Sequence, residues 1–425
     1  MELHLPYGRS VLTVELPGER VLSVVGIGGE PLFSEEQILR QALARPIGSP
    51  PLSRLVRRGE RTTIVIPDAS RRCAAQIFLP HLLEILNGKG IQDADITVLF
   101  ATGSHGRQRE EDRLEVVGPE VSRRVRLVDH DCREQADLVH VGETIKGTPV
   151  WFHKLVVKAE RLIVAGGTSH HPITGYAGGP KLLNPGCVAL ETVHRCHALG
   201  IDQEAGGLVS ECAPGVAEGN PVYDDIMDSM KFVQVDFALH VIVDARGRVR
   251  EACAGALAAS WTKARQLADA FYRVPVEQRL PLVVASCGGS PFDDTFVQAY
   301  RAIRNASSLV SDGGHLVLFA ACPQGVGAEH FLEFFAAPSQ RELARQLGAT
   351  YRSFGVTALG LRGVLQRIRL TVVGGLSVSA GAAMGVDVEP SPERALEQAL
   401  SQLPPGGQLA VVPNAHLTVP VVEGR

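Results

Sequence analysis

Short apolar strands that alternate with helical stretches constrain the fold of this chain more than any other feature. The clearest apolar, β-branched runs are residues 62–67, 96–103, 125–131, 161–167, 236–244, 281–289, 315–322 and 369–375. Helical spacing of apolar residues is found at 34–45, 73–86, 258–273, 338–348 and 391–403. Strands separated by helices are typical of βαβ units, so the pattern predicts an α/β fold with mainly parallel sheets flanked by helices.

The length of the chain predicts two domains, because 425 residues exceed the size at which one hydrophobic core usually splits. The polar segment VPVEQR at 274–279 separates two series of strands. We therefore expect a cofactor-binding domain over 1–275, which includes small strands near 11–16 and 21–26. A second α/β domain is expected over 280–425, with the active site in the cleft between them. The last strands, within 408–422, either stay in the second domain or return to the first.

Composition argues against several classes of protein. The net charge of −4 gives no basic field for nucleic acid, and 5% aromatic residues are too few for base-stacking platforms. No apolar run reaches about 18 residues, and the N-terminus lacks a signal-peptide pattern, so we expect neither a membrane span nor export. The eight cysteines are scattered without a CxxC pair, which favours reduced thiols in a cytoplasmic protein over a zinc ribbon, an iron–sulfur site or disulfides.

Polar residues follow three of the expected strands at the point where each strand ends. These segments are Asp68–Arg71, Thr102–His105 and Thr168–His171. Ligands of open parallel sheets bind at the carboxyl ends of the strands, so the sequence predicts a site there. Arg71 has the planar fork that binds a carboxylate, and two imidazoles can exchange protons on either face of one carbon. Taken singly, each histidine is more often a hydrogen-bonded loop residue than a catalyst. Asp68 and Arg71 are equally well explained as a helix-start carboxylate with a solvated arginine.

The stretch 170–197 is the richest in residues with possible functions. Gly178 and Gly179 form a glycine loop, and Asn184–Pro185 has the pattern of an N-cap and first turn, so a helix that could receive a phosphate is expected to begin there. The loop is not a Walker motif, and a tight turn with a solvated Lys181 is the alternative. His194 and His197 lie three apart on a helix and could bind a metal, although no third ligand is evident.

A second glycine loop, at 288–289, leads into an expected helix that carries Gln298 and Arg301 on one face. These residues are candidates for substrate binding, and an amphipathic surface helix is the alternative.

Taken together, these segments resemble the lactate racemase family, whose members carry a nickel-pincer nucleotide. The matching motifs are Asp-x-x-Arg at 68–71, Ala-Thr-Gly-x-His at 101–105, the histidine and lysine of 171 and 181, Asn-Pro-Gly at 184–186, His197, Gly-Asn-Pro at 219–221 and the glycine loop with glutamine at 288–298. They run from about residue 66 to 301, in order and at compatible spacing.

The resemblance implies a racemase or epimerase that inverts C2 of a small 2-hydroxy acid by proton-coupled hydride transfer. It implies that Lys181 holds the cofactor, a nickel-bearing thiolated pyridinium mononucleotide, through a covalent thioamide, and that His197 is the protein's ligand to nickel. The other implied cofactor-binding residues are Asp68, Thr102, Gly103, Gly178 and Gly179. His105 and His171 would be the two acid–bases, and Arg71, Gln298 and Arg301 would bind substrate. Cofactor-synthesis enzymes are implied as loading partners.

Two departures from the lactate-specific members predict a substrate other than lactate. Arg301 stands where those members have lysine, and Val297 stands where they have tyrosine. Their C-terminal tryptophan has no counterpart, because the two tryptophans here are Trp151 and Trp261. A guanidinium at Arg301 suits a longer substrate or one with a second carboxylate, such as malate.

Two other functions compete with this prediction. A nicotinamide-dependent dehydrogenase would need G-x-G-x-x-G after an early strand, and the sequence contains no such fingerprint. A non-catalytic protein that binds the cofactor or a ligand would have no need of both His105 and His171.

Overall fold

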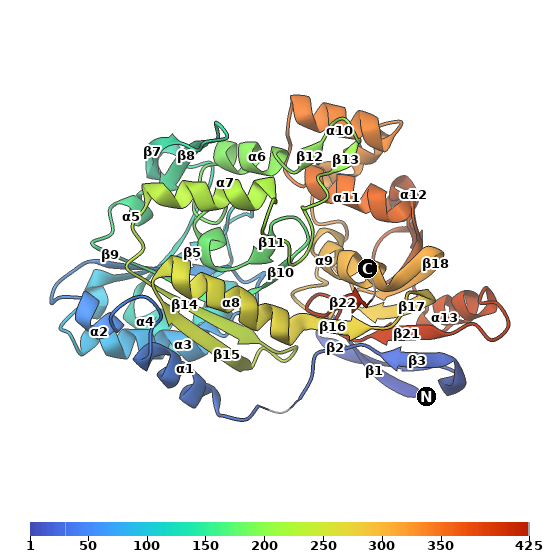
Figure 1. Ribbon diagram of the computed structural model, residues 1–425, viewed down its shortest axis with the longest axis horizontal. Helices are drawn as coiled ribbons and strands as arrows, with labels where there is room; N and C mark the ends of the chain where they lie inside the picture. Colours follow the sequence, from blue (N-terminus) through green and yellow to red (C-terminus); the bar gives the residue numbers. More distant parts are fainter. Residues whose placement is uncertain (30, 424–425) are drawn as a thin grey trace.

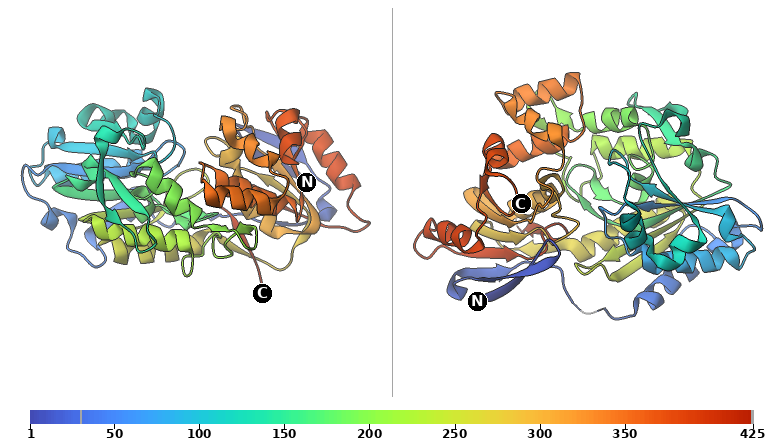
Figure 2. Two further views of the ribbon diagram at one scale, coloured as in Figure 1. Left: turned by 90° about the horizontal axis from the view of Figure 1, so that it is seen from above. Right: turned by 180° about the vertical axis from the view of Figure 1, so that it is seen from behind.

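The computed structural model describes residues 1–29 and 31–423. Figures 1 and 2 show two lobes side by side, each built around a six-stranded sheet. The sheets are mainly parallel and flanked by helices, which confirms the expected α/β fold.

The first sheet has an apolar layer on both faces. Its strand order is β15 (Val249–Gly255), β14 (Phe237–Val243), β9 (Arg161–Gly167), β4 (Thr62–Pro67), β5 (Ile96–Ala101) and β6 (Arg126–Asp129). Only β15 runs antiparallel to its neighbour. Along β4, Ile64 and Ile66 contribute to one apolar cluster and Val65 to another. A strand buried on both faces must be apolar throughout, which explains the continuous run at 62–67.

Helices cover both faces of this first sheet. They are α1 (Glu35–Ala44), α2 (Leu52–Leu55), α3 (Ala75–Asn87), α4 (Glu110–Arg124), α5 (Lys154–Val157), α6 (Leu190–Ala198), α7 (Pro221–Ser229) and α8 (Leu257–Tyr272). Side chains of α1, α3 and α4 pack on one face, and those of α5 and α6 pack on the other. α1 begins with a capping box in which Ser34 and Gln37 bind each other's backbone amides, close to the expected start.

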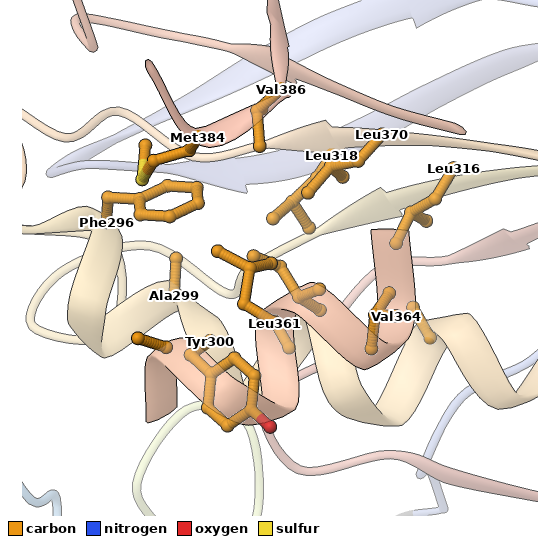
Figure 3. Close-up of a cluster of buried hydrophobic side chains, with 14 of the residues drawn as sticks. Phe296, Ala299, Tyr300, Leu316, Leu318, Leu361, Val364, Leu370, Met384 and Val386 are labelled. Carbon is orange, nitrogen blue, oxygen red and sulfur yellow. The ribbon is translucent and has the colours of Figure 1, made fainter. Parts of the chain in front are cut away.

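The second sheet is parallel throughout. Its order is β20 (Asp387–Val388), β19 (Arg369–Val373), β18 (Val310–Phe319), β17 (Leu280–Ser286), β21 (Leu409–Val412) and β3 (Val21–Val24). Its helices are α9 (Phe296–Ala306), α10 (Gln340–Ala349), α11 (Gly355–Leu365), α12 (Val378–Met384) and α13 (Pro392–Ser401). Figure 3 shows Phe296, Ala299 and Leu361 packed with Leu318 and Leu370 in the core between α9, α11 and the sheet.

The N-terminal strands correct the expected division of the chain. Residues 1–275 were expected to form one domain, yet β3 pairs with β21 in the second sheet. The hairpin of β1 (Glu2–Tyr7) and β2 (Ser10–Glu15) also packs there, with Leu5, Val14 and Leu16 in one cluster with Leu282 and Val284. Figure 1 shows the chain crossing from this hairpin to α1 in the other lobe. The hairpin's apolar face finds its partners only in the second lobe, so the first 24 residues belong to that lobe.

Four further strand pairs complete the fold. The antiparallel pairs are β7 (Leu138–Glu143) with β8 (Pro149–His153), β10 (Ser169–His171) with β11 (Gly175–Ala177) and β12 (Ile201–Asp202) with β13 (Gly207–Leu208). β16 (Arg273–Val276) pairs in parallel with β22 (Val419–Val422), so the last strand returns to the segment that joins the two lobes. In the described residues no helix combines the length and apolar character needed to cross a bilayer. All eight cysteines are free and buried.

Candidate functional site

The strands β9, β4 and β5 are neighbours in the first sheet, and their carboxyl ends bring Asp68 and His105 together. Asp68 Oδ2 lies 2.6 Å from His105 Nδ1, and Asp68 Oδ1 accepts a hydrogen bond of 2.6 Å from the Ser70 hydroxyl. The His105 side chain is 38% exposed, whereas that of Asp68 is 8% exposed. The carboxylate is therefore a buried support, and the imidazole is the part that a small molecule can reach.

The contact with Asp68 determines which nitrogen of the neutral His105 ring carries the proton. Nδ1–H donates to the carboxylate, so Nε2 keeps a lone pair and can accept a proton. Burial acts to raise the pKa of Asp68, but His105, Arg71 and Ser70 together outweigh it and hold the pKa below its usual value. Asp68 thus stays ionised and orients the base, a role that the sequence did not indicate.

Arg71 lies at the centre of the group of predicted residues. Its guanidinium is an electrostatic neighbour of Asp68, His171, Lys181 and Arg301. Among the described residues, its guanidinium makes one hydrogen bond, 3.2 Å long, to the carbonyl of Ser70. A guanidinium with most of its donors free of protein partners is suited to bind a carboxylate.

His171 ends β10 and has the opposite hydrogen-bonding pattern from His105. Its Nδ1 accepts hydrogen bonds from the backbone amides of Ile173 and Thr174, each 3.2 Å long. The neutral ring therefore carries its proton on Nε2. Burial, followed by the charges of Lys181 and Arg301, lowers the pKa of His171 well below its usual value, so the ring is neutral at neutral pH.

Lys181 lies in the short 3-10 turn η4 (Gly179–Leu182), which follows the glycine loop. Burial, with the nearby charges of Arg71 and Arg301, lowers the pKa of its amine well below the usual value. A lowered pKa increases the fraction of the amine that is unprotonated, and the unprotonated form is a nucleophile that can form an amide-type bond with an acyl group. The amine at this position therefore fits a covalently attached cofactor.

The glycine loop differs from its sequence-based prediction. A side chain at Gly178 would approach the carbonyl oxygen of Gly167 to 2.2 Å, and one at Gly179 would approach the Trp261 ring to 2.4 Å. Both glycines also have positive φ angles, 93° and 53°. Close packing against β9 and α8 accounts for both glycines, and their contact with a cofactor stays a prediction.

The expected helix start at Asn184–Pro185 is wrong. The Asn184 side chain is buried and donates a 3.0 Å hydrogen bond to the Ser229 hydroxyl at the end of α7, so it does not cap a helix. The next helix, α6, begins only at Leu190, with Ala189 as its N-cap residue. A phosphate site at a helix start directly after the glycine loop is therefore not formed.

His197 lies on α6 with the geometry of a metal ligand. Its Nδ1–H donates a 2.8 Å hydrogen bond to the carbonyl of Val193, which leaves Nε2 as the lone-pair nitrogen. Burial and the charge of Lys181 lower the pKa of His197 to about 4, so the ring is neutral and able to ligate. Its neighbour His194 instead binds the Ser353 hydroxyl at 3.0 Å.

No group of three or more potential ligands (histidine, cysteine, aspartate or glutamate) could hold a metal ion within residues 1–29 and 31–423. A metal bound at His197 would consequently need most of its ligands from outside the chain. The single neutral imidazole beside a nucleophilic lysine fits a metal that arrives with its own organic ligands.

Thr102 and Gly103 serve the packing of the β5 end. The Thr102 hydroxyl donates to the carbonyl of His130, and the Gly103 amide donates to the carbonyl of Gly186 at 3.0 Å. The Gly103 contact holds the 184–186 segment beside β5, and a role of either residue in cofactor binding stays a prediction.

The second lobe contributes Gln298 and Arg301 from α9. Gln298 is held at the helix start by Thr295, whose hydroxyl donates to Gln298 Oε1 at 3.0 Å. Arg301 reaches the first lobe, where its Nη1 donates to the Ser169 hydroxyl at 3.3 Å. Burial and the charge of Arg71 lower the pKa of Arg301 to about 9. Arg301 thus joins the group around Arg71. Among the described residues, the side-chain hydrogen bond of Gln298 stays within the second lobe.

Sequence reasoning missed the contacts that the second lobe makes with α6 and Arg301. The Tyr351 ring lies 5.3 Å from the His194 ring and 6.4 Å from the His197 ring, between centroids. His416, in the loop before β22, is an electrostatic neighbour of Arg301. In the sequence, only the polar residues Asn414 and His416 within an apolar tail hinted at the contact between His416 and Arg301.

Two family models match the chain: the lactate racemase N-terminal domain over residues 7–207 and the lactate racemase C-terminal domain over residues 276–416. A lactate racemase from Thermoanaerobacterium thermosaccharolyticum is 27% identical over 336 residues, which cover 78% of this chain and 77% of the relative. A lactate racemase from Lactiplantibacillus plantarum is 24% identical, covering 77% of each chain.

Solved structures show the same fold. The lactate racemase apoprotein from T. thermosaccharolyticum superposes with a TM-score of 0.87 at 24% identity, covering 99% of this chain and 100% of that chain. A protein from Thermotoga maritima superposes with a TM-score of 0.67 at 15% identity, covering 93% of this chain and 99% of that chain.

Proposed function

Because the chain belongs to the lactate racemase family, a family of isomerases, we propose that it inverts C2 of a small 2-hydroxy acid other than lactate. The proposed cofactor is a nickel-pincer nucleotide attached at Lys181, with His197 as the protein's ligand to nickel. Relatives named lactate racemase support the racemase chemistry. The differences at Arg301 and Val297 support the change of substrate.

One observation carries this proposal: Arg71 is the common electrostatic neighbour of Asp68, His171, Lys181 and Arg301. Residues from two strand ends, the lysine turn and α9 therefore lie near one guanidinium group. Arg71 and Arg301 form no ion pair with a carboxylate in the described part of the chain. Two neighbouring guanidinium groups that form no ion pair favour an anionic ligand, and a 2-hydroxy acid brings a carboxylate.

The chain's own residues then divide the work. Arg71 binds the C1 carboxylate and fixes the substrate, which places C2 for reaction; positioning of this kind can be worth about 7–11 kcal/mol of barrier. When bound, the cofactor supplies an acceptor that takes up the C2 hydrogen with its electron pair and returns it. His105 accepts the hydroxyl proton through Nε2, with Asp68 stabilising the imidazolium. His171 serves the opposite face, where its Nε2–H donates to the same oxygen.

Covalent attachment at Lys181 would change the neighbouring histidine. An amide-type nitrogen carries no positive charge, so the cation that helps to lower the pKa of His171 would be lost. Loss of that charge would make a second proton on His171 less costly, which favours a racemase working in both directions. Loading by cofactor-synthesis enzymes, and a cytoplasmic location with reduced thiols, belong to the same proposal.

The test is racemisation of single enantiomers from a panel of 2-hydroxy acids by protein co-expressed with the cofactor-making enzymes. We expect turnover of a 2-hydroxy acid other than lactate, and a covalent mass addition that Lys181→Ala abolishes while Lys158→Ala, on the surface, retains it. His197→Ala should lose nickel by metal analysis; His194→Ala is the matched control, since its Nε2 is engaged by Ser353. Bound cofactor without turnover of any hydroxy acid, or turnover of lactate alone, would contradict the proposal.

A further inference from the structure

His416 is a buried imidazole that the proposed reaction does not use. Its loop is fixed by Asn305 of α9, whose Nδ2 donates to the carbonyl of Ala415 at 2.8 Å. The ring is stacked on Phe292, with centroids 3.6 Å apart and planes inclined by 21°. Gly288, at a φ of 109°, makes room for it, because a side chain there would approach Nδ1 to 2.2 Å. The position of the ring is therefore closely fixed.

Two guanidinium groups lie near this ring. Arg72 lies over Phe292 at 5.6 Å and donates across the lobes to the carbonyl of Ser290. Arg301 comes from α9, one helical turn before Asn305. Both are electrostatic neighbours of His416. We call Arg72, Arg301 and His416 the His416 cluster.

The His416 cluster has unused hydrogen-bonding capacity. Arg301 Nη2 and His416 Nε2 are buried and have no hydrogen-bond partner among the described residues, and the two residues are only 9% and 2% exposed. Buried donors and charges are rarely left unpaired in native proteins unless a ligand, ion or water completes them.

Nearby carboxylates do not fill this role. Asp269 binds His170 at 2.7 Å and the Tyr176 hydroxyl at 2.9 Å. Asp293 Oδ2 accepts from the backbone amides of Gly8 at 2.8 Å and Ala321 at 3.1 Å. Within residues 1–29 and 31–423 no carboxylate forms a salt bridge with Arg72, Arg301 or His416, so the cluster keeps its positive charge.

Arg301 belongs to both groups, because it is an electrostatic neighbour of Arg71 and His171 and also of His416. We propose that the His416 cluster is a second anion site, which binds a carboxylate on the C2 substituent while Arg71 binds the C1 carboxylate. The substrate class is then the short 2-hydroxy dicarboxylic acids. This inference rests on the proposed function and adds His416 and Arg72 as specificity-determining residues. The methyl group of lactate would leave the cluster unpaired.

Calorimetry on the purified protein without cofactor tests the site separately from the chemistry. The probes are succinate, with two carboxylates, and propanoate, with one, at fixed ionic strength. We expect succinate to bind at least 10-fold more tightly. His416→Phe preserves the stack on Phe292 and should reduce that ratio to near one, as should Arg72→Gln. Arg273→Gln, which removes an exposed cation beside His170, is the control and should leave the ratio unchanged.

Equal affinities for succinate and propanoate in the parent protein would overturn the second anion site, whatever the racemase assay shows. An undiminished preference in folded His416→Phe and His416→Gln would overturn the role of His416; two variants are used in case one does not fold. In the loaded enzyme, the ratio of kcat/KM for malate over lactate should exceed 10 and fall in the same variants. Tight succinate binding without turnover of any hydroxy acid would instead reject the proposed function and leave the site standing.

Discussion

At His105 the ring nitrogen Nδ1 meets a carboxylate, whereas at His171 the same nitrogen accepts hydrogen bonds from two backbone amides. The first ring is partly exposed beside one anion, and the second has Lys181, Arg301 and Arg71 as neighbours. The partner of Nδ1 decides which nitrogen holds the proton in the neutral ring. Two identical side chains therefore present opposite groups at Nε2, a lone pair at His105 and an N–H at His171.

Replacing either histidine should cause the largest loss. In cofactor-loaded protein, His105→Gln and His171→Gln should each lower kcat by about 10²–10⁴-fold, the usual contribution of a general acid or base. Glutamine retains polarity but cannot exchange protons. The measurement is the initial rate of racemisation from each enantiomer, with nickel content determined in parallel. A rate within a few-fold of the parent in either variant would remove that residue from the two-base scheme.

Asp68→Asn should affect only the His105 side of the comparison. The amide keeps the shape of the carboxylate but no longer stabilises a protonated ring, so kcat should fall by about 10–100-fold. Ser70→Ala is the matched control, because it removes the other hydrogen bond to Asp68 and leaves the imidazole contact in place. If both variants lost activity equally, Asp68 would act through the local turn rather than through His105.

Lys181→Ala should affect the His171 side. Without the lysine charge, the pKa of His171 should rise toward its ordinary value of 6.5, because that charge is among the groups that lower it. An NMR titration of the imidazole signals in protein without cofactor measures the shift. Lys158→Ala removes an exposed lysine and should leave the His171 signal in place.

Acid stability offers the smallest and most general test. A folded-state pKa below the unfolded value of 6.5 means that His171 contributes stability above pH 6.5, and that this contribution is lost as the pH falls. His171→Gln should therefore make the free energy of unfolding less dependent on pH below 6.5, by up to about 1.4 kcal/mol per pH unit. Urea unfolding at several pH values measures the slope. Identical slopes in the two proteins would mean that His171 is not buried as a neutral ring.

The strands could be predicted from the sequence because a strand that is buried on both faces must be apolar along its whole length. Residues 62–67 and 161–167 show the pattern in a form that local composition reveals. The pairing of β3 with β21 had no such signal, since it depends on an apolar surface formed hundreds of residues later. The helix start predicted at Asn184–Pro185 was wrong because asparagine is a good N-cap residue in isolation, whereas here its side chain binds Ser229.

Motif spacing predicted which residues belong to the candidate site. The structure brings five of them together: Asp68, Arg71, His171, Lys181 and Arg301. Spacing alone does not reveal hydrogen-bond direction. Nδ1 contacts a carboxylate in His105, two backbone amides in His171 and a backbone carbonyl in His197. These partners are known only from the fold. The sequence did not indicate His416 as a site residue, because His416 belongs to no motif and its place near Arg301 depends on the contact between its loop and α9.

The pairing of β3 with β21 also has a consequence for synthesis on the ribosome. The first strands made belong to a sheet whose central and neighbouring strands are among the last. At about 5–20 residues per second, the N-terminal hairpin waits tens of seconds before Leu409–Val412 emerges. During that time the first lobe can complete its sheet while the hairpin's apolar face stays uncovered. In a nascent chain of this kind the hairpin is exposed the longest, and its removal should destabilise the second lobe.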